Sequence, residues 1–127
     1  MDETPDNSVD KVTVFLLDDH ELVREGVRQL LEADGTIEVV GEAGTCADAV
    51  TRIRATRPQV AILDVQLPDI DGFEVAARLT NGGGGPAVVL VSSRDGSDFG
   101  PLVERSGARG FIPKAELSGA ALLSLLE

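Results

Sequence analysis

The sequence predicts an α/β protein whose five parallel strands form one sheet, with helices packed on both faces. The first observation is an alternation: short apolar runs are followed by segments of helical periodicity, five times over. The second is that no internal repeat interrupts this pattern, and 127 residues are enough for one domain. Right-handed crossovers between successive strands then place helices on both sides of the sheet.

Five runs have the length and apolar character of strands that are buried on both faces. Most are bounded by glycine, proline or acidic residues, which end strands and begin turns. The predicted strands are Val12–Leu17, Ile37–Val40, Val60–Leu63, Ala87–Val91 and Arg109–Ile112. Gly41–Gly44 is predicted as a turn after the second strand.

Each predicted strand is followed by a segment with apolar residues at helical spacing. Thr45 can cap the second of these helices, and Pro58 blocks its continuation beyond about Arg57. The other predicted helices are His20–Glu32, Phe73 to about Leu79, Leu102–Ser106 and Ala115–Glu127. Gly96, Gly100 and Pro101 make a helix costly before Leu102, so Asp95–Pro101 is expected to be irregular or mobile before phosphorylation.

Composition and charge argue against several classes of protein. No apolar run approaches the ~18 residues of a membrane span. The acidic and polar residues 1–10 are unlike a secretory signal and are expected to form a disordered lead-in. A net charge of −11 argues against direct nucleic-acid binding by this chain. A single cysteine, Cys46, cannot form an internal disulfide, which suits a cytoplasmic protein.

Polar side chains follow four of the predicted strands. Asp18 and Asp19 follow the first strand, Asp64 the third, Ser92 the fourth and Lys114 the fifth. In open α/β sheets, ligands bind at the carboxyl ends of the strands. If these four strands are neighbours, all five side chains face one crevice. Three carboxylates gathered in one crevice repel one another and need a cation.

Oxygen ligands without a histidine or cysteine cluster suit Mg²⁺. A metal ion, the ammonium of Lys114 and the hydroxyl of Ser92 together suit the oxygens of a phosphoryl group. A carboxylate can also be the nucleophile that receives such a group. Asp64 is central in the set, so we predict it as the phosphoryl acceptor.

The chain resembles a receiver domain of two-component response regulators from about Lys11 onward. The acidic pair, the block L-D-V-Q-L-P-D-I-D-G, the serine after the fourth strand and the lysine after the fifth match in order and spacing. The segments D-D-H-E-L-V-R-E-G, G-E-A-G and R-G-F-I-P-K resemble the subgroup usually joined to a LuxR-type helix-turn-helix.

The resemblance implies a role for individual residues. Asp64 would be the phosphoacceptor, and Ser92 and Lys114 would contact the phosphoryl group. Asp19, Asp64 and the backbone carbonyl of Gln66 would bind Mg²⁺ directly, with Asp18 acting through water. Phe111 would be the aromatic residue whose rotamer follows Ser92, and Gln66 and Arg94 would tune the lifetime of the phosphoryl group.

The resemblance also implies a flavodoxin-like fold with strand order 2-1-3-4-5 and a receiver domain over residues 11–127, with no output domain in this chain. The expected partner is a sensor histidine kinase or a phosphotransfer protein, with a homodimer as a further expectation, and no membrane or nucleic acid. The receiver is expected to assist its own phosphorylation and dephosphorylation rather than act as an enzyme. Phosphorylation is expected to switch the surface formed by the fourth helix, fifth strand and fifth helix.

Three other functions are alternatives to a phosphorylation switch. The first is a receiver-like interaction module that works without phosphate, although the intact acidic pair, Ser92 and Lys114 favour phosphorylation. The second is a Mg²⁺-dependent phosphatase, which usually carries a second acid where this chain has Gln66. The third is a flavodoxin-like electron carrier, which would need flanking aromatic residues, and the chain has no Trp or Tyr.

Two further expectations concern the site. A cis peptide commonly follows the active lysine in receiver domains, so a cis Lys114–Ala115 bond is expected despite its cost of roughly 3–4 kcal/mol. His20, beside the acidic pair, is expected to be a surface residue rather than a ligand.

Overall fold

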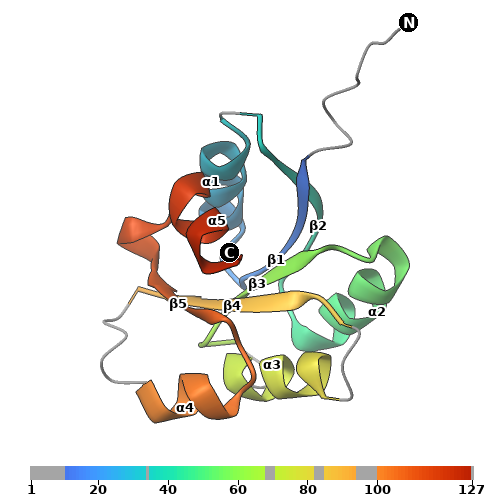
Figure 1. The fold of residues 1–127 in the computed structure, drawn as a ribbon. Helices are drawn as coiled ribbons and strands as arrows, with labels where there is room; N and C mark the ends of the chain where they lie inside the picture. Colours follow the sequence, from blue (N-terminus) through green and yellow to red (C-terminus); the bar gives the residue numbers. More distant parts are fainter. Residues whose placement is uncertain (1–10, 34, 68–70, 82–84, 94–99, 127) are drawn as a thin grey trace, which may run out of the picture.

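A five-stranded parallel sheet forms the centre of the computed structural model, which describes residues 11–33, 35–67, 71–81, 85–93 and 100–126. The strands lie in the order β2-β1-β3-β4-β5 (Figure 1). Their bounds are β1 (Val12–Leu17), β2 (Ile37–Ala43), β3 (Val60–Asp64), β4 (Ala87–Ser92) and β5 (Gly110–Pro113). The strand order expected from the resemblance is confirmed, and β3, which ends in Asp64, is the central strand.

Helices cover both faces of this sheet. Figure 1 shows α1 and α5 together on one face, with α2, α3 and α4 on the other. Their bounds are α1 (Glu21–Glu32), α2 (Cys46–Thr56), α3 (Gly72–Thr80), α4 (Gly100–Arg105) and α5 (Gly119–Leu126). The doubly wound α/β arrangement predicted from the alternation is therefore confirmed.

The central strands are buried on both faces, which explains why they are continuously apolar. In β1, Phe15 and Leu17 belong to the core beneath α2 and α3, whereas Val14 and Leu16 belong to the core beneath α1 and α5. All four side chains are buried. Every residue of β3 is buried as well. This double burial fixes the ends of β1 and β3, and with them the acidic residues that follow.

Polar side chains cap the starts of α2 and α3. The side chain of Thr45 accepts a hydrogen bond from the backbone N–H of Asp48, as predicted for the start of α2. Asp71 caps α3 in the same way, accepting from the N–H of Glu74 at 2.8 Å. At the other end of α2, Arg57 takes the left-handed conformation with φ 49°.

The turn predicted at Gly41–Gly44 is wrong, because β2 continues to Ala43. A Cβ atom at Gly41 would lie 2.8 Å from the ring of Phe15 on the neighbouring strand. Glycine is thus needed here for the close approach of an aromatic ring rather than for a turn. The register between β1 and β2 also shifts between Val14 and Phe15.

The last two helices differ from their prediction. Helix α4 begins at Gly100, and Pro101 lies in its first turn, where a missing N–H costs no hydrogen bond. The final helix does not start at Ala115, since a short 3-10 helix, Lys114–Glu116, comes first. Ser118 then accepts a hydrogen bond from the N–H of Ala121, which fixes a separate start for α5.

Several predictions lie outside the described residues. These are the lead-in 1–10, the position of Arg94 and residues 95–99 of the segment predicted to be irregular. For Gly100 and Pro101, the last two residues of that segment, the prediction is wrong, because both belong to α4. In α1, Leu31 is buried whereas Leu22 is 82% exposed, so the apolar face of this helix is only partly covered. Within the described segments, no helix is both long and apolar enough to cross a membrane.

Candidate functional site

Lys114 joins two carboxylates at the carboxyl ends of the strands. Its Nζ lies 2.6 Å from Oδ2 of Asp18, which follows β1, and 2.9 Å from Oδ2 of Asp64, which ends β3. Asp18 is 6% exposed and Asp64 is 3% exposed. Three of the five residues predicted to converge therefore form one charged cluster, in which the two aspartates are buried and Lys114 is partly buried.

The charge of Lys114 is maintained by these two partners. Burial by itself lowers the pKa of the ammonium, but hydrogen bonds and charge interactions with Asp18 and Asp64 outweigh that effect, so the pKa is raised. Lys114 is therefore positively charged at neutral pH. The site has a fixed cation beside its central carboxylate, as recognition of a phosphoryl oxygen requires.

The loop after β3 orients Asp64. The backbone N–H of Gln66 donates to Oδ1 of Asp64 at 2.9 Å, while Oδ2 faces Lys114. The N–H of Gly72, the first residue of α3, donates to the carbonyl of Val65. A Cβ atom on Gly72 would lie 2.7 Å from the Cα of Val65 and closer still to the carbonyl oxygen of Asp64. The start of α3 is thus packed directly against the backbone that carries Asp64.

His20 lies within the acidic cluster, which the sequence interpretation did not anticipate. Its Nδ1 is 3.0 Å from Oδ1 of Asp19 and 3.4 Å from Oδ1 of Asp18, and its backbone N–H donates to Asp18. The ring itself is 66% exposed, so the prediction of a surface residue is correct. The adjacency of His20 to two acids in the sequence was the available signal.

Arg24 fixes the backbone of the acidic loop and was missed by sequence analysis. Its guanidinium donates to the carbonyl oxygen of Asp18 and, through Nε, to Oε1 of Glu42 at 3.2 Å. Glu42 also pairs with Arg28 at 2.9 Å. A Cβ atom on Gly44 would lie 3.3 Å from the Arg24 guanidinium, so glycine leaves space for it. This cluster ties the end of β1 to the end of β2.

Replacing Arg24 by alanine is expected to lower the free energy of unfolding by about 1–3 kcal/mol, because hydrogen bonds from a charged donor are lost. Urea denaturation measures this change. Arg78→Ala is the matched control: it removes an exposed pair with Glu74 within α3 and should cost less than about 0.5 kcal/mol. Equal effects of the two substitutions would contradict a special role for Arg24.

The remaining predicted residues are placed as follows. Ser92 is the last residue of β4 and is fully buried, next to the strand that ends in Asp64. Phe111 is partly buried on β5 and packs against the core beneath α2 and α3. Gln66 is exposed and directs its N–H to Asp64. Its carbonyl as a metal ligand stays a prediction, as do the phosphoryl contacts of Ser92 and the rotamer of Phe111.

The expected cis bond between Lys114 and Ala115 is wrong. Among the described residues there is no cis peptide bond. Lys114 nevertheless reaches both carboxylates, because the 3-10 helix that it begins turns the chain without one. The reason given for the cis bond, that the lysine must bend back toward Asp64, is met by an ordinary trans backbone.

The carboxylate set fits a hard divalent cation. Oxygen atoms of Asp18, Asp19 and Asp64 and a nitrogen of His20 all lie within 4.8 Å of one another. Carboxylate oxygens on a concave sheet edge are the ligands that Mg²⁺ takes in proteins, with water completing its octahedral shell. The residues present therefore fit the predicted ion. The assignment of Asp19 and Asp64 as its direct ligands, with Asp18 acting through water, stays a prediction.

Taken together, the doubly wound sheet and the cluster of Asp18, Asp64 and Lys114 at its edge define the class of receiver domains. The sequence matches the response regulator receiver domain model over residues 14–126. This chain belongs to that family.

Curated relatives and solved structures support the same family. The DNA-binding transcriptional activator DevR/DosR of Mycobacterium tuberculosis is 42% identical over 103 residues, which cover 81% of this chain and 48% of the relative. The transcriptional regulatory protein UhpA of Escherichia coli is 36% identical, with 81% and 51% covered. The solved receiver domain of NarL from M. tuberculosis has a TM-score of 0.81 at 37% identity, covering 92% of this chain and 98% of that one. The chain thus spans about half the length of the curated relatives that it matches.

Proposed function

We propose that this receiver domain accepts a phosphoryl group on Asp64 from a phosphohistidine of a sensor kinase or phosphotransfer protein. The single observation that carries the proposal is the placement of Lys114 Nζ 2.9 Å from Oδ2 of Asp64 and 2.6 Å from Oδ2 of Asp18. A merely structural carboxylate at a strand end does not require a partly buried lysine from the end of β5. Bringing two carboxylates and an ammonium out of water costs free energy. Charged groups in such an environment cluster at functional sites, which favours a functional role for this set.

The transfer uses groups of this chain. A carboxylate oxygen of Asp64 forms a bond to phosphorus while the bond from phosphorus to the imidazole nitrogen breaks. The electron pair remains on the nitrogen of the donor histidine, which takes a proton from water. Lys114, charged and already beside Asp64, pairs with a phosphoryl oxygen as the group arrives. The buried hydroxyl of Ser92 is the donor for another oxygen.

Mg²⁺, when bound by the carboxylates of Asp19 and Asp64, supplies further neutralisation of phosphoryl charge. The N–H of Gln66 on Oδ1 keeps the Asp64 carboxylate in one orientation before the donor arrives. The chain thereby assists its own phosphorylation and later dephosphorylation without acting as an enzyme on another substrate.

The output is proposed from the relatives. Phosphorylation would draw Ser92 inward, and Phe111 would follow on β5, so that the surface of α4, β5 and α5 changes shape. Several relatives are named as transcriptional regulators, which supports a role in regulating transcription through an output domain or partner in the cytoplasm. A phosphorylation-dependent homodimer is one form of that output.

Incubation of the protein with acetyl phosphate and MgCl₂, followed by intact mass measurement, tests this function. One added phosphoryl group is expected, and chelation of the metal should prevent its addition. An unchanged mass at metal concentrations that saturate the protein would contradict the proposal and favour an interaction module that works without phosphate.

Asp19→Asn is expected to weaken Mg²⁺ binding by at least about tenfold, because even indirect metal partners contribute that much. It should not destabilise the metal-free protein, since Asp19 is partly exposed, does not pair with Lys114 and repels the neighbouring carboxylates. Calorimetric titration measures the first effect and urea denaturation the second. Equal Mg²⁺ affinity in the two proteins would exclude Asp19 as a ligand.

A further inference from the structure

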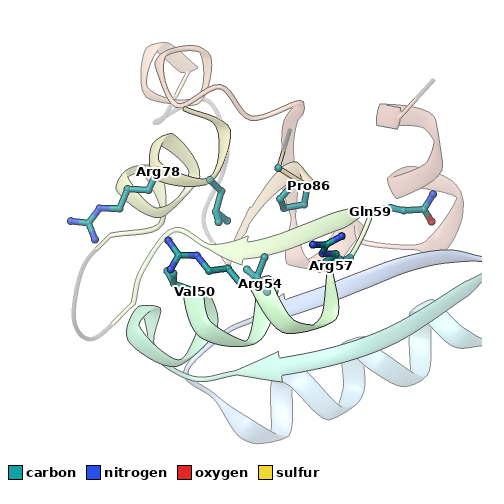
Figure 2. Close-up of a pocket in the computed structure, with 10 residues that line it drawn as sticks. Val50, Arg54, Arg57, Gln59, Arg78 and Pro86 are labelled. Carbon is teal, nitrogen blue, oxygen red and sulfur yellow. The ribbon is translucent and has the colours of Figure 1, made fainter. Parts of the chain in front are cut away.

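An open groove of about 910 Å³ lies at the edge of the sheet opposite Asp64. It runs between the C-terminal parts of α2 and α3, and the residues that precede β3 and β4 close it. Figure 2 draws the residues that line it and labels Val50, Arg54, Arg57, Gln59, Arg78 and Pro86. Its floor is apolar, since Ile53 and Pro58 are buried there. The volume lies within the range of ligand-binding clefts.

The charge of the groove is opposite to that of the whole chain. The protein carries 22 acidic and 11 basic residues, yet the described residues that line the groove include three arginines and no acidic residue. In Figure 2, Arg54 and Arg78 extend from facing helices toward the same side, while Arg57 lies below Pro86. Arg78 pairs with Glu74 at 2.7 Å. Within the described residues, the side chains of Arg54 and Arg57 have no ion pair or hydrogen bond.

Helix ends explain two of these arginines but not the third. Arg54 and Arg78 lie in the last turns of α2 and α3, where a positive charge complements the helix dipole. Arg57 lies beyond α2 in the left-handed conformation, which is costly for any residue with a Cβ atom and which glycine adopts freely. Among the described residues, it is the only non-glycine residue with positive φ. The fold would thus favour glycine at this position, so the arginine side chain needs another reason.

We propose that this groove binds an acidic peptide segment of a partner protein, with an apolar side chain on the floor and carboxylates paired with Arg54, Arg57 and Arg78. Three features favour a peptide over a small anion. The cations are spread over two helices and a loop rather than focused on one point. Two helix C-termini, with their negative dipole ends, face the groove, which disfavours a small anion seated deep between them. No aromatic side chain among the described lining residues is available to stack on a nucleobase.

The site is independent of phosphoryl transfer. It lies at the amino ends of β3 and β4, whereas Asp64 and Ser92 lie at their carboxyl ends. A partner bound there leaves the acceptor site open to its donor. The result of the acetyl phosphate experiment therefore neither supports nor contradicts this proposal.

The test is a titration of the full chain with the blocked peptide EEELEEE, in which nitrogen–proton NMR spectra are recorded at each step. Its neutral counterpart QQQLQQQ and inorganic pyrophosphate are titrated in parallel. The acidic peptide is expected to shift the amide signals of the groove, including Val50 and Gln59, and to bind more weakly as salt is added. Arg57→Gly is expected to weaken this binding by about twofold to fivefold, as for one exposed ion pair. Its urea midpoint should be equal to or above that of the wild type.

Arg109→Gln is the matched control. Arg109 is exposed and does not line the groove, and the substitution removes the same charge. It should bind the acidic peptide as the wild type does. Equal binding of QQQLQQQ, or equal loss in Arg109→Gln, would overturn recognition by charge in the groove. Pyrophosphate that shifts the same signals at lower concentration than EEELEEE would overturn the peptide as occupant, and the absence of shifts would overturn the site.

Discussion

Asp64→Asn is expected to abolish phosphoryl uptake from acetyl phosphate, with a loss of at least about a thousandfold in rate, as for removal of a catalytic nucleophile. The amide is nearly isosteric with the carboxylate but cannot attack phosphorus. Its oxygen can still accept the hydrogen bond from the N–H of Gln66, and Lys114 keeps its contact with Asp18. The variant should therefore fold while losing the reaction, which intact mass measurement resolves.

The matched control is Asp71→Asn. Asp71 is exposed, caps α3 and lies in the same chain segment, but it is outside the cluster. Asparagine caps helices about as well as aspartate, so both stability and phosphorylation should be retained. A phosphoryl group found on Asp64→Asn at the wild-type level would place the acceptor elsewhere in the chain.

Gly72→Ala is expected to lower the free energy of unfolding by about 3 kcal/mol, the upper range of overpacking costs. The added Cβ would meet the carbonyl oxygen of Asp64 and the Cα of Val65, and backbone atoms at the end of a buried strand cannot move aside cheaply. Because the strain falls on the backbone of Asp64, the proposed acceptor, phosphorylation should slow as well. Urea denaturation and the acetyl phosphate reaction measure the two effects.

The same substitution at Gly26 provides the comparison. Gly26 lies within α1, and a Cβ atom there would meet nothing within 4 Å. Gly26→Ala should therefore raise the free energy of unfolding by about 0.5–1 kcal/mol, as expected for alanine in an exposed helix interior. If Gly72→Ala were also neutral or stabilising, the tight packing of α3 against β3 would not be maintained in solution.

The site could be predicted from sequence because parallel strands deliver their C-terminal residues to one edge. Asp18, Asp64 and Lys114 each follow an apolar run directly, so strand order alone brings them together. Burial on both faces makes such runs easy to recognise. The family resemblance supplied the strand order, and the contacts of Lys114 with both carboxylates follow from it.

What sequence reasoning missed depends on contacts between residues that no local pattern connects. Arg24 has the appearance of an ordinary polar residue on α1, and only the fold brings it to the carbonyl of Asp18 and to Glu42 on β2. Gly41 reads as a turn residue, but it accommodates the ring of Phe15 from the next strand. The 3-10 helix after β5 replaced an expected cis bond, because several backbone routes lead a lysine toward the same carboxylate.

The bridge made by Lys114 has a consequence for the order in which the molecule acquires its activity. Lys114 and Asp64 are separated by 50 residues, and β4 must be in place between β3 and β5 before they meet. We expect a contact of such long range to form late in folding, because the loop-closure entropy must be overcome first. A chain still emerging from the ribosome holds its acidic residues without their counter-cation until the last strand has docked. Under the proposed function, only a complete domain would accept the phosphoryl group, and nascent or truncated copies would not compete for its donor.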